Sequence, residues 1–472
     1  MKQRLREDAI ARLMADLGRA ELGDPRRVAR AQQMVARLAR SPRESLPSAM
    51  VTAAELEGAY RFFNNDDVSF AELLDAHASA VAERAAGRDL VLAIHDTTTC
   101  SFPRAEAEAI GYLPTGKAGF LLHLCLLVDT GDWRRPLGIV YGEPIRRSRR
   151  TRRPRKASGI ETARWKNKES ERWLRGVEAS ERKLAGKAAV IHVADRESDQ
   201  YALLGSMVGA NQRFVIRARH DRCVTDAEGR ALHIREMVER LEPALEREVP
   251  LTRRLAESAP VARRNHPPRE GRIAKLQIAS TTAELVGPRY VDGAPTSTTI
   301  NVVYVSEIDA PNGQEPVDWL LYTSEPIETP AQIVAVVDYY RCRWLIEELN
   351  KALKTGCVVQ ERQLESYEAL LNMLAMSLPI AVELLALRSI ARSAPERPAT
   401  DFLSPGQLRA LRHLSHRPVP EHATVKDVLW CIAGIGGHIK NNGPPGWQVL
   451  QRGMGAFLAF AAGWCAREAA DL

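Results

Sequence analysis

The central part of the chain, residues 69–365, alternates short apolar runs with helical stretches, and this alternation constrains the fold more than any other feature. Strands that alternate with helices indicate an α/β layer structure. The predicted strands are residues 90–95, 120–128, 137–141, 190–194 and 213–219. From about 245 to 325 the sequence changes to β-rich runs between Pro/Gly turns, so we expect an all-β insertion inside the α/β domain.

Helical segments flank this region, at about residues 1–68 and 366–472. In the first, Asp24 and Pro25 are typical of a helix start, and Ser41 with Pro42 ends the helix. One face of this helix is apolar, and the other carries Arg26, Arg30, Gln33, Arg37 and Arg40. Because no acid lies between residues 24 and 44, we expect this face to bind DNA phosphates, although an ordinary surface helix is the alternative.

Composition supports a globular protein with a polyanionic partner. Apolar residues make up 45% of the chain and charged residues 26%, which excludes collagen-like and wholly disordered chains. Lys and Arg exceed Asp and Glu by 66 to 59, a net charge of +7. The segment 146–156 (RRSRRTRRPRK) holds eight basic residues in eleven. It predicts a phosphate-binding loop, with a solvated loop or a nuclear-targeting signal as alternatives.

The sequence also predicts a cytoplasmic location, on the nucleoid when DNA is bound. The seven cysteines are scattered without a CxxC pair, as in a protein with reduced thiols and no zinc site. The charged N-terminus does not resemble a secretory signal. The apolar stretch 369–382 is shorter than the roughly 20 residues that span a membrane, so we expect a core helix.

Two aspartates follow predicted strands at equivalent points. Asp96 comes directly after 90–95, and Asp195 directly after 190–194. In open α/β sheets, sites are built at the carboxyl ends of strands. A single Asp there is more often a turn or cap residue. Two aspartates in the same context raise the support for a shared site. On this evidence a shared site and two separate turn residues are about equally supported.

A third candidate acid lies in a helix that Thr329 and Pro330 begin and that ends before Gly356. One ridge of this helix, about 21 Å long and opposite the apolar stripe, carries Tyr340, Arg343, Glu347 and Lys354. Such a ridge suits contact with a metal and a phosphate together. A surface salt-bridge ladder is the alternative, because Arg343 and Glu347 are four residues apart.

Three carboxylates suit metal-assisted phosphodiester chemistry. Two divalent ions about 3.5–4 Å apart can activate the attacking oxygen and stabilise the leaving one. Mg²⁺ prefers oxygen ligands, which two Asp and one Glu supply. The chain has no P-loop, so ATP-driven work is not expected, and we interpret the glycines at 433–437 as a turn.

Together these segments resemble the DDE transposases of the bacterial insertion-sequence-four group. The resemblance rests on IHDTT around Asp96, ADRESD around Asp195, and the spacing Tyr340-x2-Arg343-x3-Glu347-x6-Lys354. It extends over nearly the whole chain, through ELGDPRR (21–27), EGAYRF (57–62), FVIRARH (214–220), WLLYTSEP (319–326) and GIGG (434–437). Within the group, the chain looks closest to the cut-and-paste transposase of the composite kanamycin-resistance transposon.

The resemblance implies a ribonuclease H-like catalytic domain at 69–365, with the β-rich insertion at about 245–325. An N-terminal domain at 1–68 would bind the transposon end, and a helical domain at 366–472 would mediate dimerisation. Asp96, Asp195 and Glu347 would be the catalytic triad and would bind two Mg²⁺ ions, for which Mn²⁺ can substitute. The reaction would be end nicking, hairpin formation and resolution, and strand transfer into target DNA, within a homodimeric synaptic complex and without a membrane or a nucleotide cofactor.

The resemblance also assigns DNA contacts. Trp319 would stack on a flipped end base, with a core tryptophan as the alternative. Tyr340, Arg343 and Lys354 would hold a phosphate near the hairpin, and Arg217 would lie close to the active site. The end-recognition residues would be Arg26, Arg27, Arg30, Tyr60 and Arg61. We expect the dimer surface to use the apolar residues Trp447, Leu450, Met454, Phe457, Leu458 and Phe460.

Two other functions are consistent with parts of this pattern. A catalytically silent, transposon-derived DNA-binding protein would occupy the ends without cutting them, although it would not need three intact acids. A ribonuclease H-like nuclease would cut DNA without strand transfer, although simple hydrolysis needs neither the Tyr/Arg/Lys set nor Trp319.

Overall fold

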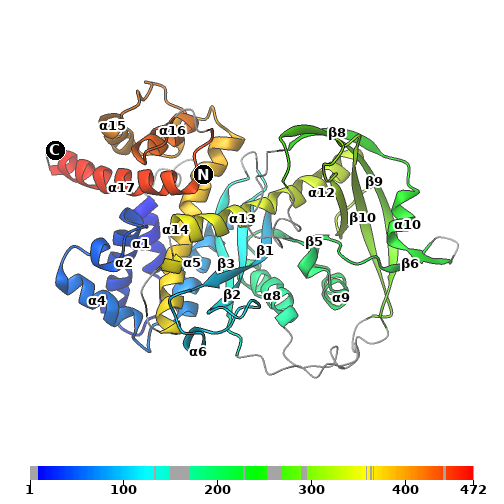
Figure 1. The fold of residues 1–472 in the computed structure, drawn as a ribbon, viewed down its shortest axis with the longest axis horizontal. Helices are drawn as coiled ribbons and strands as arrows, with labels where there is room; N and C mark the ends of the chain where they lie inside the picture. Colours follow the sequence, from blue (N-terminus) through cyan, green and yellow to red (C-terminus); the bar gives the residue numbers. More distant parts are fainter. Residues whose placement is uncertain are drawn as a thin grey trace. The chain divides into compact units, whose positions relative to one another are not determined.

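The computed structural model describes residues 9–131, 134–148, 169–226, 229–251, 268–288, 295–357, 359–361, 364, 366–439 and 443–470. The chain divides into two compact units (Figure 1). The first comprises Met1–Arg153, Leu174–Val190 and Trp344–Leu472, and the second comprises Pro154–Trp173 and Ile191–Arg343. The units are described separately. Most of the predicted arginine-rich loop, residues 149–156, lies outside the described residues.

The first unit begins with the helices α1 (Ala9–Leu17), α2 (Pro25–Arg40), α3 (Leu46–Ala49), α4 (Ala53–Phe63) and α5 (Phe70–Ala85). The predicted limits of α2 are confirmed. The Asp24 side chain accepts a hydrogen bond from the Arg26 amide at the start, and Ser41 caps the end. Its apolar face, with Ala31, Val35 and Leu38, is fully buried.

Three antiparallel strands form the sheet of this unit in the order β3-β2-β1: β1 (Leu90–Ser101), β2 (Gly119–Asp129) and β3 (Pro136–Ile145), with the short helix α6 (Ala107–Ile110) between β1 and β2. The prediction that Asp96 follows the strand is wrong, because Asp96 lies in the middle of β1, opposite Leu124 of β2. The β-branched residues 97–99 continue the strand, since β2 is long enough to pair with them as far as Ser101.

The rest of the first unit is helical. It contains most of α8 (Arg172–Leu184), α13 (Trp344–Lys351), a π-helical turn (η4, Ala352–Gly356), α14 (Tyr367–Ser393), α15 (Pro405–Leu414), α16 (Val425–Ile435) and α17 (Trp447–Ala470), with short 3₁₀ turns at Val359–Glu361 (η5) and Ala399–Asp401 (η6). Helix α14 is long and apolar enough to cross a membrane, but 94% of its most apolar window is buried inside the protein. It packs against α5, β3, α13 and α16, so the predicted core helix is confirmed.

The glycines near residue 435 allow α16 and α17 to approach closely. A side chain on Gly436 would lie 1.8 Å from the Val449 carbonyl oxygen, and one on Gly453 would lie 1.8 Å from that of Ile432. Only glycine permits such backbone contact. Gly436 caps α16, and Gly437 has a φ of +89°, which agrees with the predicted turn.

The apolar residues predicted to form a dimer surface lie inside the chain instead. Trp447, Leu450, Met454, Phe457 and Leu458 are all buried, and Phe460 is half-buried. They belong to α17, which packs against α2, α15 and α16 of the same unit. Sequence periodicity identifies an apolar face, but the same pattern serves an internal neighbour and a second copy equally well.

The second unit is built on a mixed sheet. Its strands are β4 (Ala189–Ala194, from Ile191), β5 (Arg213–Arg217), β6 (Cys223–Thr225), β7 (Ala231–His233), β8 (Leu245–Leu251), β9 (Arg272–Val286), β10 (Ser297–Ile308) and β11 (Asp318–Thr323). Their order is β4-β5-β11-β10-β9-β6-β7, with β8 on β9. Only the β4–β5 pairing among these is parallel.

The β-rich texture predicted at 245–325 is present as β8–β11. These strands continue the sheet, because β11 pairs with β5 through Leu321 and Arg217. The described residues of this unit form the helices α9 (Tyr201–Gly209), α10 (Ile234–Glu239) and α12 (Pro330–Cys342), with 3₁₀ turns at Glu169–Glu171 (η2) and Arg196–Ser198 (η3). Helices α9 and α12 both pack against β5 and β10. The protein is therefore of the mixed α/β class that the sequence predicts.

Candidate active site

Asp96 on β1 and Asn350 on α13 form the centre of the candidate site in the first unit. The Asn350 Nδ2 donates a 3.0 Å hydrogen bond to Asp96 Oδ2. Helix α13 packs against β1, which brings these residues together although 254 positions separate them. Asp96 is partly accessible, whereas Asn350 is 9% exposed. Sequence reasoning missed Asn350, although its position three residues after Glu347 was a usable signal.

Glu347 lies on the same helix, one turn before Asn350, and is partly exposed. Residues three apart on a helix are neighbours on its surface. Glu347 and Asn350 therefore share the side of α13 from which Asn350 reaches Asp96. The structure thus places the first and third predicted acids on two elements of one unit that pack together.

The residue after Glu347, Glu348, forms an ion cluster that holds α13 in place. Glu348 is 6% exposed and lies 3.2 Å from the Arg388 guanidinium and 3.7 Å from that of Arg392, both on α14. The Arg388 guanidinium in turn lies 4.4 Å from the ring centre of Trp447. A buried acid that lost such partners would be strongly destabilising, so this cluster holds α13 against α14. Apart from the acidic pair Glu347 and Glu348, nothing in the sequence predicts this cluster.

Lys354 occupies a different place from the one predicted. The helix is not continuous: α12 ends at Cys342, α13 begins at Trp344, and Lys354 lies in the π-helical turn. Arg343 keeps helical backbone angles (φ −52°, ψ −30°), whereas the π-helical turn departs from the 3.6-residue period, so the predicted ridge of Tyr340, Arg343 and Glu347 does not extend to Lys354 as an ideal helix would place it. Burial lowers the pKa of Lys354, while the nearby Cys100 and Asp96 act in the opposite direction. Turns of this kind often occur at functional sites.

Asp195 belongs to the second unit, directly after β4, as the sequence predicts. Its Oδ1 accepts a 2.9 Å hydrogen bond from the Glu197 amide, so the carboxylate caps the 3₁₀ turn Arg196–Ser198. The cap uses one oxygen, and the side chain stays partly exposed. The neighbouring Asp199 is buried and structural, since it accepts from the amides of Arg219 and His220.

An aromatic and cationic cluster forms a second part of the candidate site, within the second unit. The rings of Trp319 and Tyr340 meet edge to face at 5.3 Å, and the Arg343 guanidinium lies 6.0 Å from the Tyr340 ring centre. Arg217 donates to the Asp318 carbonyl oxygen at 2.8 Å. Burial lowers the pKa of Arg217; Tyr340 opposes this effect, while Arg196 and Arg343 strengthen it. Arg217 still carries a positive charge at neutral pH, because arginine keeps its proton in proteins.

The cluster brings together four residues that sequence reasoning assigned to DNA: Trp319, Tyr340, Arg343 and Arg217. Tyr340, however, is only 5% exposed and supports the others. Trp319 is neither fully buried nor fully exposed, because one side of the indole is covered by Tyr340. The Trp319 indole can stack on a base while the guanidinium groups of Arg217 and Arg343 bind phosphate.

The basic face of α2 is less purely cationic than the sequence predicts. Arg37 pairs with Glu55 of α4 at 2.9 Å, and Arg27 pairs with Asp67. Two of the predicted DNA contacts, Arg27 and Arg61, thus have acidic partners, since Arg61 pairs with Glu57. Helical periodicity could not show this, because Glu55 and Asp67 come from other segments.

Arg26, Arg30 and Tyr60 keep polar surface on the same side of the N-terminal helices. Arg26 is exposed, and its guanidinium makes no ion pair with a described residue. Arg30 lies over Gly58, where a Cβ atom would come within 2.5 Å of the guanidinium. Tyr60 is 36% exposed. Of the predicted DNA contacts, those without an acidic partner among the described residues thus lie on α2 and α4.

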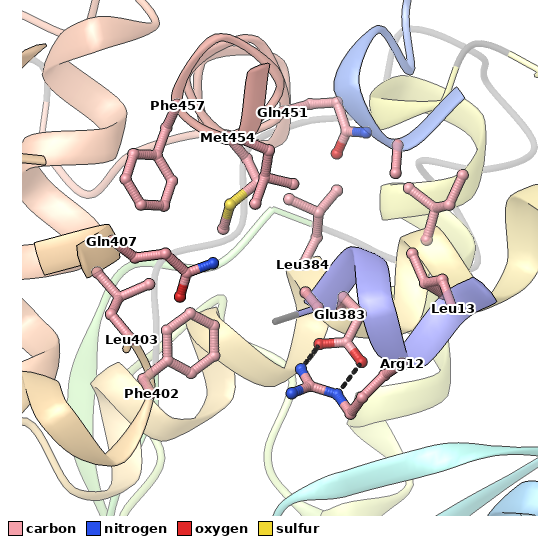
Figure 2. Close-up of a pocket in the computed structure, with 14 residues that line it drawn as sticks. Arg12, Leu13, Glu383, Leu384, Phe402, Leu403, Gln407, Gln451, Met454 and Phe457 are labelled. Carbon is pink, nitrogen blue, oxygen red and sulfur yellow. Dashed lines mark hydrogen bonds and ion pairs between the residues drawn. The ribbon is translucent and has the colours of Figure 1, made fainter. Parts of the chain in front are cut away.

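An apolar pocket elsewhere in the first unit carries none of the predicted catalytic or DNA-binding residues. Figure 2 shows Leu13, Phe402, Met454 and other side chains lining it between α1, α14 and α17. Its one ion pair joins Arg12 to Glu383 at 2.7 Å. Burial alone would raise the pKa of Glu383, but the charge and hydrogen bond of Arg12, together with the charges of Arg135 and Arg84, lower it overall. The pocket is a packing crevice with its charges already paired.

The donors of the first unit fit a hard cation. Asp96 offers carboxylate oxygens, and the buried Asn350 Oδ1 accepts no hydrogen bond from the described residues. Carboxylate and amide oxygens are ligands that Mg²⁺ accepts. No group of three or more His, Cys, Asp or Glu residues is assembled around a metal position in the described part of the chain. Asp96 and Glu347 belong to one unit and Asp195 to the other.

Comparisons with known proteins find one family model that matches the N-terminal helices. Residues 12–68, which span α2, α3, α4 and most of α1, match the family model described as "Transposase DNA-binding". Among solved structures, the chain is similar to the piggyBac transposase in its synaptic complex with hairpin DNA. That similarity has a TM-score of 0.37 and 12% identity and covers 83% of this chain and 75% of that one.

Proposed function

We propose that this protein is a DNA transposase of the DDE type that moves DNA by a cut-and-paste reaction. The observation that carries the proposal is the match of residues 12–68 to the transposase DNA-binding family. The spacing of Tyr340, Arg343, Glu347 and Lys354 supports membership of the insertion-sequence-four group. It also supports the resemblance to the transposase of the kanamycin-resistance transposon. The partners are transposon-end and target DNA, and the protein acts in the bacterial cytoplasm.

The catalytic centre in this proposal comprises Asp96, Glu347 and Asp195, on a ribonuclease H-like fold. The antiparallel strands β1–β3 and the parallel pair β4–β5 support that fold. The three carboxylates would hold two Mg²⁺ ions, which supply Lewis-acid activation of the attacking and leaving oxygens. Asn350 holds the Asp96 carboxylate, and the Glu348 cluster holds the helix that carries Glu347.

The aromatic and cationic cluster would act on the second DNA strand. Trp319 would stack on a base removed from the helix, and Arg217 and Arg343 would bind the adjacent phosphates, with Tyr340 supporting both. This arrangement suits a hairpin intermediate, in which a strand is sharply bent. Two protomers would form the synaptic complex, each with one transposon end.

The test is cleavage of a duplex that carries the inverted repeats flanking the gene. With Mg²⁺ or Mn²⁺ we expect a nick, then a hairpin, and then joining to target DNA. Asp96→Ala, Asp195→Ala and Glu347→Ala should each abolish every step and leave end binding intact, as gel-shift measurements would show. Nicks without hairpins would indicate a nuclease, and end binding without any cleavage would indicate a catalytically silent DNA-binding protein.

A further inference from the structure

Asn350 combines a buried, half-satisfied amide with a hydrogen bond to a partly accessible acid, and this contact with Asp96 distinguishes it from the buried Asn372. Its side chain is nine-tenths buried beside a partly accessible acid, and only half of its amide has a partner. The Nδ2 donates to Asp96 Oδ2, whereas Oδ1 accepts no hydrogen bond from the described residues. A buried polar atom without a partner costs roughly 1–3 kcal/mol, and a cation held at the adjacent Asp96 would supply a partner for this one.

The orientation of this amide follows from its partner. A carboxylate accepts hydrogen bonds and cannot donate them, so the NH₂ side of Asn350 must face Asp96. The carbonyl oxygen is therefore the atom left over. Like a carboxylate oxygen, it is a hard donor that accepts a Mg²⁺ or Mn²⁺ ion or a water bound to one.

The elements around Asn350 make its position rigid. Helix α13 is held by Glu348 to Arg388, and the following turn is held by the Arg43 guanidinium, which donates to the Thr355 carbonyl oxygen at 2.7 Å. Asp96 lies within β1, which pairs with β2 both before and after this residue, from Val91 to Ser101. Site groups on rigid elements keep their geometry, whereas groups on loops lose it.

We propose that Asn350 is a positioning residue for Asp96 and supplies one further contact to the divalent cation. Its Nδ2 fixes the Asp96 carboxylate, and its Oδ1 contacts the cation directly or through one bound water. The inference rests on the proposed function, because it places the cation at Asp96. The inference adds the uncharged Oδ1 of Asn350 to the cation ligands, which the sequence signature limits to the three acids Asp96, Asp195 and Glu347.

The experiment measures cation binding without DNA or turnover. Thermal unfolding and Mn²⁺ binding are compared for the native protein, Asn350→Leu, Asn350→Asp and Asp96→Asn. Asn372→Leu is the matched control, because Asn372 is also buried with an unpartnered Oδ1 in the described structure, but its Nδ2 binds the carbonyl oxygens of Phe63 and Val68. Loss of a supporting group of this kind typically weakens metal affinity about 10–100-fold.

We expect Asn350→Leu to weaken Mn²⁺ binding at least tenfold and to remove most of the cation-induced rise in Tm. Asn350→Asp should lower the Tm without cation, because two carboxylates then meet, and should show a larger cation-induced rise than the native protein. Asn372→Leu should lower the Tm equally with and without cation. If both Asn350 variants also behave in that way, Asn350 is only structural and the inference is wrong.

The outcomes separate this inference from the proposed function. A native protein whose Tm and cleavage are both insensitive to Mn²⁺ would refute the metal-dependent function itself. A native protein that responds to Mn²⁺, with Asp96→Asn unresponsive and Asn350→Leu as responsive as the native protein, would refute the Asn350 contact alone.

Discussion

A buried network attaches the first helix to the sheet β1–β3, and its removal has a calculable effect. Asp16 of α1 is 5% exposed and accepts hydrogen bonds from His77 Nδ1 at 2.8 Å and from both terminal nitrogens of Arg84 at 2.7 and 2.9 Å. The other ring nitrogen of His77 accepts from the Ile139 amide of β3. The network thus runs from α1 through α5 to the sheet.

The contribution of this network to the stability of the fold follows from the shift in the pKa of the Asp16 carboxyl group. Burial would raise the pKa of Asp16, but the hydrogen bonds from His77 and Arg84 outweigh it and bring the pKa from 3.8 to about 2. At about 1.4 kcal/mol for each tenfold change, this corresponds to about 2 kcal/mol. Because the folded pKa is the lower one, the stabilisation is fully present above about pH 4 and is lost as the pH falls towards 2.

Asp16→Asn should therefore lower the free energy of local opening of α1 by about 2 kcal/mol at pH 7. Hydrogen exchange of the α1 amides should then be roughly thirtyfold faster. Mass-spectrometric hydrogen exchange over residues 9–17 measures this directly. Asp67→Asn is the control, because Asp67 is 66% exposed and its pair with Arg27 should contribute less than about 1 kcal/mol. The native advantage over Asp16→Asn should also shrink between pH 4 and pH 2. Equal effects of the two substitutions at pH 7, or an advantage that persists to pH 2, would refute the reasoning.

Three further predictions concern DNA and helix packing. Trp319→Ala should reduce hairpin formation at least tenfold more than nicking, and equal loss of both in a gel assay would contradict a base-stacking role. Arg26→Ala should lower the slope of log affinity against log salt by about one, whereas Arg61→Ala, whose partner is Glu57, should change it less. Gly453→Ala should lower the Tm by several degrees, because its Cβ would overlap the Ile432 carbonyl oxygen, while Gly463→Ala in open space should not.

The features that could be predicted from the sequence depend on neighbours along the chain. The limits of α2 follow from Asp24, Pro25 and Ser41, whose effects act within one turn of the backbone. The α/β class follows from apolar runs that the structure confirms as strands, such as β2 and β4. The position of Asp195 after its strand is a local property of the same kind.

The features that could not be predicted depend on a partner from elsewhere. Strand β1 continues through Asp96 because β2 pairs with it, and a polar run alone indicates a turn. Arg37 is neutralised by Glu55 of another helix. The spacing of Asn350 from Glu347 places both on one side of a helix, but only the packing of α13 on β1 shows that Asn350 reaches Asp96.

Helix α17 shows how an internal contact limits what remains for a second protomer. Gly453 meets the backbone of α16, and a Cβ on Gly455 would lie 2.7 Å from the Arg40 carbonyl oxygen of α2, so this face of α17 is covered by its own chain. The exposed positions on the same helix include Arg452, Ala456 and Ala459, which recur at helical spacing. A dimer that used α17 would therefore meet through this exposed face and not through Trp447, Leu450, Met454, Phe457 and Leu458, which are already buried inside the protomer.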